Sequence, residues 1–170
     1  MSLFDDWFAQ LMEHEGAYSD DPRDPGNWTG GKEGVGKLLG TKYGIAANTF
    51  PTLDIRNLTL ADAAGIYRVR YFPQSFEALP PGIAWALADA AVNSGMSRAV
   101  KWLQQVVGSP ADGLFGPATL RAVQSAVQQR GAAQVRAHML TERALFMAAL
   151  PTFSTYGRGW FRRLFSLKAF

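Results

Sequence analysis

Apolar residues recur every three or four positions along most of the chain, which is the spacing of one face of an α-helix. The first such run, from Leu3 to Met12, predicts an amphipathic helix that Gly16 would end. Residues 18–44 interrupt the pattern, because they are rich in Gly, Pro, Asp and Lys and carry no helical period. We interpret this stretch as a long loop with a short β-hairpin, turned by the glycines at 30, 31, 34 and 36.

The helical pattern returns after Pro51. Thr59 is a good N-cap for a helix that Pro73 would close. Further helices are predicted at 83–93, at 99–107 before Gly108, from Pro117 onward, and at 132–150 before Pro151, with a short aromatic and basic segment at 160–165. The predicted fold class is therefore α+β and predominantly helical, with a small β element in the N-terminal part. We expect two parts, 1–82 and 83–170, packed as one compact unit.

Composition limits the chemistry. The chain of 170 residues has no Cys, which excludes disulfides and thiolate metal sites. His14 and His138 lie far apart and lack a Cys or acidic partner at ligand spacing, so we expect no metal and no cofactor. The formal net charge of +3 suits an anionic polymer, which nucleic acid, a membrane surface or the bacterial cell wall would each provide.

Glu15 is the strongest candidate for a chemical role. It lies about one turn beyond Leu11 and Met12 on the predicted first helix, so its carboxyl group would point near the buried face. Burial disfavours the charged form and raises the pKa, and a glycosidase needs such a protonated acid for the leaving oxygen. The alternative is an ordinary surface glutamate at a helix end, and Glu13 competes for the same role.

Polar and aromatic partners follow in the loop. Asp20, Asp21 and Asp24 could supply the second polar group that a glycosidase needs opposite its acid. Asp beside Pro and Gly is also ordinary turn chemistry, so a purely structural role stays open. Trp28 is the best aromatic candidate for a sugar-stacking platform, because the tryptophans of the apolar helices have the spacing of a core.

The run His14-Glu15-Gly16-Ala17-Tyr18, an Asp-Pro-rich loop and Thr41-Lys42-Tyr43-Gly44-Ile45 follow one another in order. This series resembles the Glu-Gly-Gly-Tyr motif and following sequence of the N-acetylmuramidases of glycoside hydrolase family 108, phage-type lysozymes that cut peptidoglycan. The resemblance implies a lysozyme-like fold, with Glu15 as catalytic acid and Asp24 as the second group. It also implies that Tyr18, Thr41 and Tyr43 contact the substrate.

Two features depart from that family pattern. Ala17 replaces the second Gly of the motif, which implies that the backbone there needs no positive φ. The segment 29–40 is longer than the family usually shows. It is either a substrate flap, with Lys32 and Lys37 near anionic wall groups, or a set of solvated turns.

The second half also resembles a known domain. Leu87 to Gly95, Trp102-Leu103-Gln104, Asp112-Gly113 and Gly116 to Leu120 follow the order of the predicted peptidoglycan-binding domain of these enzymes. The resemblance implies that 1–82 is the catalytic part and 83–170 the peptidoglycan-binding part. Asn93 would either reach the substrate cleft with its amide or cap its own helix.

We therefore expect a monomeric N-acetylmuramidase that cleaves the β-1,4 bond between N-acetylmuramic acid and N-acetylglucosamine in bacterial peptidoglycan. Nucleic acid is not an expected partner, and neither is stable membrane insertion. The alternative is a non-catalytic peptidoglycan-binding or secretion-assisting protein with the same fold. Asp5 and Asp6 stand where a secretory signal would carry Lys or Arg, so we expect synthesis in the cytoplasm and action in the periplasm or wall after release through a pore or secretion system.

Overall fold

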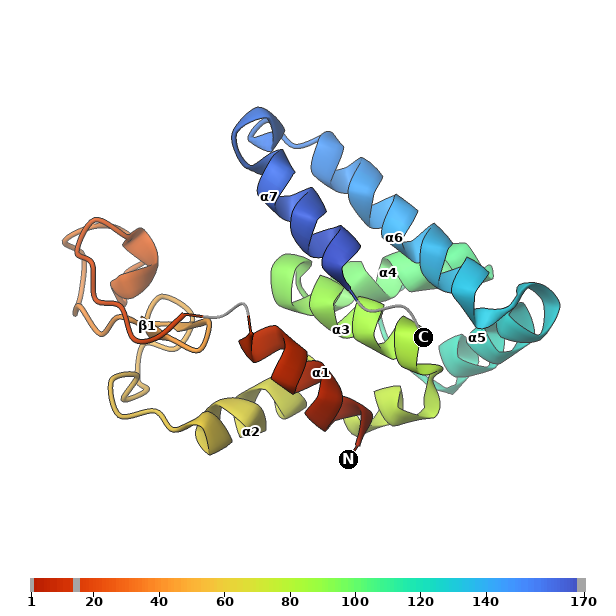
Figure 1. Ribbon diagram of the computed structural model, residues 1–170, viewed down its shortest axis with the longest axis horizontal. Coiled ribbons are helices and arrows are strands. Elements are labelled where there is room, and N and C mark those ends of the chain that lie inside the picture. Colours follow the sequence, from red (N-terminus) through yellow and green to blue (C-terminus); the bar gives the residue numbers. More distant parts are fainter. Residues whose placement is uncertain (1, 14–15, 168–170) are drawn as a thin grey trace. The chain divides into compact units, whose positions relative to one another are not determined.

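The computed structural model describes residues 2–13 and 16–167. Their backbone contains helices α1 to α7 and one small two-stranded sheet, which confirms the predicted α+β, predominantly helical fold class (Figure 1). Contacts divide the chain into two compact units, unit 1 (Met1–Val69) and unit 2 (Arg70–Phe170). The functional division expected at 1–82 and 83–170 stays a prediction.

Unit 1 opens with α1 (Leu3–Met12), and a capping box fixes its start. The Ser2 hydroxyl accepts the Asp5 N–H at 3.3 Å, and the Asp5 carboxylate accepts the Ser2 N–H at 2.9 Å. The helix ends at Met12, with Glu13 as its C-cap in right-handed conformation, so the prediction that it extends to Gly16 is wrong. Gly16 is not among the glycines of positive φ, the conformation in which a glycine usually ends a helix.

Aromatic packing joins α1 to α2 (Leu60–Arg70). The predicted N-cap of α2 is confirmed, because the Thr59 hydroxyl accepts the Asp62 N–H at 3.1 Å. Tyr67 of α2 is buried, and its ring lies 6.1 Å from that of Trp7 and 5.6 Å from that of Phe8. Rings at such distances contribute beyond the area they bury, so this cluster forms the core of unit 1.

The loop between α1 and α2 contains the sheet. Strands β1 (Thr41–Lys42) and β2 (Ile45–Ala46) are antiparallel, with Thr41 opposite Ala46. The hairpin predicted around the glycines at 30–36 is reduced to an isolated bridge between Trp28 and Leu38, and the regular strands lie after it. The short 3-10 helix η1 (Pro25–Asn27) precedes that bridge.

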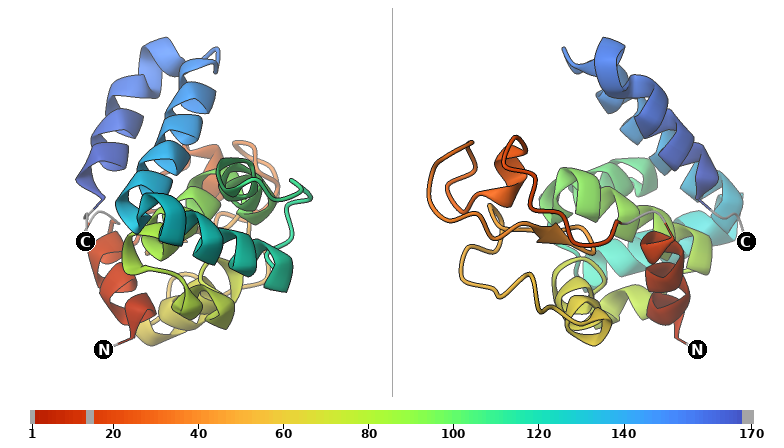
Figure 2. Two further views of the ribbon diagram at one scale, coloured as in Figure 1. Left: turned by 90° about the vertical axis from the view of Figure 1, so that its right-hand side faces the viewer. Right: turned by 60° about the vertical axis from the view of Figure 1, so that its left-hand side comes forward.

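Unit 2 is a helical bundle built around α3. Every residue of α3 from Ile83 to Ala91 is buried, and the helix packs against α4 and α6. Helices α6 and α7 lie side by side, as both views of Figure 2 show. The elements are η2 (Gln74–Ala78), α3 (Pro81–Ser94), α4 (Met96–Val107), α5 (Pro117–Arg130), α6 (Ala132–Ala148) and α7 (Phe153–Ser166).

The predicted helix ends of unit 2 are mostly confirmed. Gly108 caps α4 in left-handed conformation with φ 71°, and Pro117 is the first residue of α5. By contrast, α7 is much longer than the short segment predicted at 160–165. Two glycines of α7 obscure it in the sequence, and Gly157 is needed because a Cβ there would lie 2.5 Å from the Phe153 ring.

A buried ion pair crosses the bundle of unit 2. The Asp89 carboxylate on α3 accepts from Arg143 of α6 at 2.6 Å and from Arg163 of α7 at 2.9 Å. The Asp89 and Arg143 side chains are 4% and 1% exposed. Among the described residues, Nε and one terminal nitrogen of Arg143 have no hydrogen-bond partner, so Asp89 is the group that compensates this buried charge.

Charge is divided unevenly between the two units. Residues 70–170 carry eleven Lys or Arg against four Asp or Glu, whereas residues 1–69 carry six against ten. Unit 2 is therefore the part suited to an anionic partner. None of the helices in the described ranges combines the length and apolar character that a bilayer crossing requires.

We predict that Asp89→Asn lowers the free energy of unfolding by about 3 kcal/mol, because it leaves two arginine side chains without their counter-charge inside the bundle. Urea denaturation followed by circular dichroism measures the change. Asp62→Ala is the control, since it removes only an exposed carboxylate that accepts the Thr59 N–H at the start of α2, and it costs about 1 kcal/mol. Equal losses for the two variants would contradict the role of the buried pair.

Candidate active site

A buried asparagine organises the loop of unit 1. Asn27 is fully buried, and its Nδ2 donates to the Asp21 carbonyl at 3.0 Å. Its Oδ1 accepts from the Thr41 hydroxyl at 2.7 Å. Its backbone carbonyl accepts the N–H groups of Leu39 and Gly40 at 3.0 and 3.1 Å. One residue thus connects three segments of this loop, which has little regular secondary structure.

Thr41 is held on both sides. Its backbone exchanges two hydrogen bonds with Ser19, at 2.9 and 2.8 Å, and its strand also pairs with β2. Because its hydroxyl donates to Asn27, the side chain has one fixed orientation. The lone pairs of this hydroxyl oxygen can still accept a hydrogen bond from a ligand or a water.

Tyr18 lies over Gly40 in the same segment. Its hydroxyl donates to the Leu39 carbonyl at 3.3 Å, and the Arg56 guanidinium lies 4.8 Å from its ring centroid. Arg56 also pairs with the Asp20 carboxylate at 3.0 Å. Gly40 has φ 82°, and a Cβ there would lie 2.7 Å from the Tyr18 ring and 2.6 Å from the Ser19 carbonyl oxygen. The ring can occupy this place only because residue 40 has no side chain.

Tyr43 adopts a rare backbone conformation between the two strands. Its φ of 52° is the one positive value at a non-glycine residue in the described ranges, and its carbonyl accepts from the Tyr67 hydroxyl at 3.0 Å. The Lys42 ammonium lies 5.4 Å from the Tyr43 ring centroid. Strained residues of this kind gather at functional sites. Since Tyr43 is the one such residue, Ala17 does not have a positive φ, which confirms the prediction from the sequence.

Asp24 has a structural task in the loop. It is exposed, it is the N-cap of η1, and its Oδ1 accepts the Gly26 N–H at 2.8 Å. Its backbone carbonyl accepts the Asn27 N–H at 3.1 Å, so it is tied to the same network as Thr41. The turn role is therefore present in the structure, whereas a chemical role stays a prediction.

Asp21 does not have the properties of a proton donor. Hydrogen bonds from the Arg23 side chain, and from its backbone, lower the pKa of Asp21 to about 2. A carboxyl group with that pKa is ionised near neutral pH, so it can accept hydrogen bonds but cannot hold a proton for a leaving group. This interaction is on the surface, with the Arg23 side chain 84% and the Asp21 side chain 40% exposed.

Trp28 is fixed by its indole nitrogen. The indole N–H donates to the Pro22 carbonyl at 2.8 Å, and the half-buried ring lies at the bridge to Leu38. The following residues form exposed turns, in which the Thr29 N–H bonds to the Lys37 carbonyl at 2.9 Å. The predicted sugar-stacking role of Trp28 requires a free ring face and is not tested by these contacts.

Asn93 lies in unit 2, on the last turn of α3. Its side chain is exposed, and its Nδ2 donates to the carbonyl of Asp89 at 2.8 Å. This is the helix-end contact that the sequence left open as an alternative. Glu15 and His14 lie outside the described residues, so the placement of the predicted acid stays a prediction. Glu13, the competing glutamate, is the exposed C-cap of α1.

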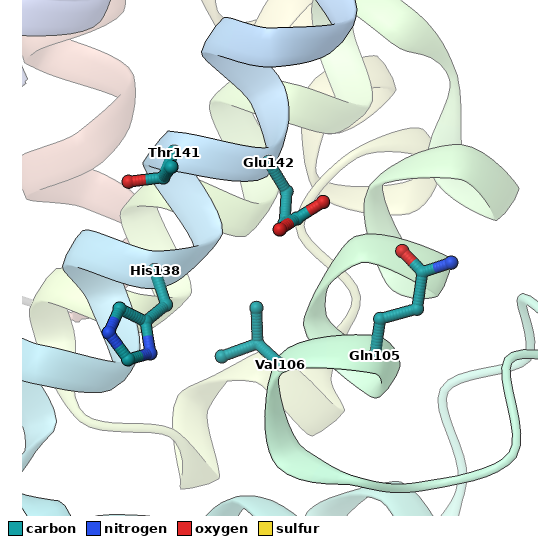
Figure 3. A pocket seen from close by; sticks show the side chains of 5 residues that line it. All are labelled: Gln105, Val106, His138, Thr141 and Glu142. Atoms are coloured by element: carbon teal, nitrogen blue, oxygen red, sulfur yellow. The ribbon is translucent and has the colours of Figure 1, made fainter.

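Unit 2 contains a polar hollow of about 460 Å³ between α4 and α6. Figure 3 shows its wall, with Gln105 and Val106 on α4 opposite His138, Thr141 and Glu142 on α6. Within the described ranges, no three His, Cys, Asp or Glu side chains are close enough to hold a metal ion. A hollow with one imidazole and one carboxylate is a surface for hydrogen bonding.

Sequence reasoning missed the two residues on which the loop depends most, Asn27 and Gly40. Asn27 follows Asp24-Pro25-Gly26, a series that predicts a turn but says nothing about burial of the next side chain. Gly40 directly precedes the Thr41 motif, and a glycine next to a strand is a recognisable signal of close approach by another segment.

We predict that Gly40→Ala disrupts the loop, whereas Gly34→Ala does not. Both glycines have positive φ, 82° and 74°, so both substitutions cost about 1 kcal/mol of backbone strain. Only at residue 40 would the new Cβ meet other atoms; at residue 34 none lies within 4 Å. Thermal unfolding and the amide NMR spectrum around Thr41 measure the difference. Equal effects would show that close packing on Tyr18 is unimportant.

Each half of the chain is similar to a known protein family or domain. The profile of the family described as "Glycosyl hydrolase 108" matches residues 8–95, and that of the "Predicted Peptidoglycan domain" matches residues 98–165. The solved structure titled "Structure of Brucella abortus SagA" is similar over 96% of this chain and 90% of that chain, with 32% sequence identity and a TM-score of 0.78. No curated protein matches the sequence. The chain therefore belongs to the glycosyl hydrolase 108 family and carries a C-terminal peptidoglycan domain.

Proposed function

We propose that the protein is an N-acetylmuramidase that cleaves the β-1,4 bond between N-acetylmuramic acid and N-acetylglucosamine in peptidoglycan. Membership of a glycosyl hydrolase family and the peptidoglycan domain support a function on this polymer. The observation that carries the proposal furthest is the Asn27 network, which ties Asp24 and Thr41 together in the loop that follows Glu15.

Glu15 is the proposed general acid. It donates its proton to the glycosidic oxygen, which is a poor leaving group until it is protonated. The neighbouring loop acids are poorly suited to this step, because Asp20 is paired with Arg56 and Asp21 has a pKa of about 2. Glu15 is close to these acids in the sequence, but as the general acid it requires surroundings that raise its pKa and keep it protonated.

Asp24 is the proposed second group. With Thr41 or Tyr43, it positions a water molecule or stabilises the positive charge that develops on the sugar in the transition state. Its exposure and its cap hydrogen bond to Gly26 leave one carboxylate oxygen for this task. Thr41 supports the same step with an oxygen whose orientation is fixed by Asn27.

Tyr18 and Trp28 are the proposed sugar contacts of unit 1. Both rings are half-buried and both are fixed by hydrogen bonds from their polar atoms, to Leu39 and Pro22 respectively. A ring fixed in this way loses little side-chain entropy when a sugar packs on it. Asn93 is a proposed contact in unit 2.

The proposed setting follows from the substrate. Peptidoglycan lies outside the inner membrane, so a protein made in the bacterial cytoplasm reaches it through a pore or a secretion system. We propose that it acts there as a monomer without a metal ion or cofactor, because acid catalysis by carboxyl groups needs neither.

We predict that Glu15→Gln abolishes release of reducing ends from purified peptidoglycan, because an amide cannot donate the proton. Circular dichroism should be unchanged. Glu13→Gln is the matched control and should keep the wild-type rate, since Glu13 is an exposed helix cap. Wild-type activity in a folded Glu15→Gln protein would remove Glu15 from the mechanism.

We predict that Asp24→Asn lowers the rate about 100-fold while leaving stability unchanged. Asn is as good an N-cap as Asp, so the substitution keeps the turn and removes only the charge. Steady-state kinetics and thermal unfolding together separate the two roles. An unchanged rate would restrict Asp24 to its structural task.

A second candidate function is binding to peptidoglycan without cleavage, as in a wall-binding or secretion-assisting protein. One observation favours it: the Asp24 carboxylate is already engaged in capping η1. Sedimentation with insoluble peptidoglycan distinguishes the two candidates. Binding with no soluble fragments from the wild type supports the second candidate, and fragments that disappear in Glu15→Gln support the first.

A further inference from the structure

Unit 2 contains a small pocket, separate from the hollow between α4 and α6, which we name the Arg98 pocket. Its volume is about 230 Å³. Asn93 and Ser94 of α3 and Arg98 of α4 form its polar side. Its apolar side includes Phe146 near the end of α6, Leu150 between α6 and α7, and Trp160 in the middle of α7. A pocket with one apolar side and one polar side matches a pyranose ring, whose faces carry C–H groups and whose edges carry hydroxyls.

Arg98 supplies the charge of the pocket. Its guanidinium lies 4.5 Å from the Phe146 ring centroid, and the residue is exposed. Stacking on a ring orders the guanidinium without neutralising it, and its edge still offers N–H groups in the geometry that a carboxylate binds. The Arg98 guanidinium therefore favours a ligand with an anionic group.

Asn93 supplies an oriented amide. Because its Nδ2 donates to the Asp89 carbonyl, the plane of the amide is fixed at the rim of the pocket. A fixed amide can exchange hydrogen bonds with a sugar hydroxyl or an N-acetyl group at little entropic cost. Ser94 adds a hydroxyl from the next position.

Trp160 supplies the aromatic surface. Its half-buried ring is held by two neighbours on α7, Phe153 at 6.4 Å and Tyr156 at 6.0 Å between centroids. The ring therefore has a defined orientation before any ligand binds. Tyr156 is 57% exposed, which extends the aromatic surface outward from the pocket.

The hollow between α4 and α6 has the opposite chemistry. It includes the Glu142 carboxylate and has no Phe, Tyr or Trp ring among its described residues (Figure 3). The Arg98 pocket has no acidic residue among its described residues, and it belongs to the unit with eleven basic and four acidic side chains. Of the two, only the Arg98 pocket suits an anionic sugar.

We infer that the Arg98 pocket binds one N-acetylated amino sugar whose substituent carries a carboxylate, as a muramyl peptide does. The pocket is smaller than the roughly 300 Å³ at which sites for whole small molecules begin, so it takes a single sugar residue rather than a length of glycan. This inference rests on the proposed function in one respect, since both take peptidoglycan as the polymer. It adds a binding site in unit 2 and a preference for an anionic amino sugar over an uncharged one.

Muramyl dipeptide tests the inference on the full-length protein. This probe has one sugar, so it contains no bond for the proposed activity to cleave, and binding is measured apart from catalysis. Titration calorimetry gives the Kd, and amide NMR shifts locate the site. We expect shifts at Ser94, Arg98 and the Trp160 indole, and only weak binding of uncharged N-acetylglucosamine.

Arg98→Gln should weaken muramyl dipeptide binding about tenfold and leave N-acetylglucosamine binding unchanged, because only the first ligand has a carboxylate. Arg121→Gln is the matched control, since it removes an exposed arginine from α5 of the same unit and should have no effect. Trp160→Phe should weaken both ligands.

Three results would overturn the inference: no binding at millimolar probe, shifts confined to His138 and Glu142 or to unit 1, or equal effects of Arg98→Gln and Arg121→Gln. Failure of the proposed function is distinct from these. It would appear as intact muramyl dipeptide binding in a protein that releases no fragments from peptidoglycan.

Discussion

The hydrogen bond between the Asn27 amide and the Thr41 hydroxyl is the contact on which the loop of unit 1 depends. The described residues between α1 and α2, 13 and 16–59, have only two short strands and one turn of 3-10 helix, so their backbone groups cannot be satisfied by regular structure alone. The buried residue Asn27 satisfies several of them at once, because its side-chain amide donates to the Asp21 carbonyl and its backbone carbonyl accepts the N–H groups of Leu39 and Gly40. The cost of burying that amide is offset only because each of its polar atoms has a partner. The same contact fixes Thr41 and connects it to the turn of Asp24. The hydrogen bonds that order the loop therefore also position the groups that we propose for catalysis.

In unit 2, a buried ion pair determines how the helices pack. Between Ile83 and Ala91, its central helix α3 is apolar on all sides except at Asp89, which attracts Arg143 and Arg163 from two later helices. An apolar bundle can pack in several registers, and a buried charge with two specific partners favours the one in which all three meet. Most of the other basic residues that the structure describes in this unit are exposed. They give this unit the positive charge that an anionic wall polymer requires, and they include Arg98 at the pocket we assign to a muramyl group.

Much of the fold could be predicted because its signals are local. Gly108, Pro117 and Thr59 mark helix ends by their own backbone or hydroxyl chemistry, and the structure has the helices where they indicate. The errors occur where the local signal competes with packing. Gly16 suggests a helix end but α1 ends earlier, and the glycines of α7 suggest a break although Gly157 only makes room for Phe153.

The candidate site was less accessible to sequence reasoning. Tyr18, Asp24, Trp28, Thr41 and Tyr43 were identified from their order along the chain, and all five lie in the loop of unit 1. The residues that hold this loop, Asn27 and Gly40, were not identified, because burial of an amide and the approach of a ring depend on contacts between segments distant in sequence. Arg98 was missed for a similar reason: its ring partner Phe146 lies two helices away.

The most direct test of the account is mass spectrometry of the soluble fragments that the wild-type protein releases from purified peptidoglycan, after borohydride reduction of their ends. Cleavage by an N-acetylmuramidase predicts fragments that end in reduced N-acetylmuramic acid. Fragments ending in reduced N-acetylglucosamine would show that the other glycosidic bond is cut. The absence of any fragment, with the protein bound to the wall, would contradict the enzymatic account.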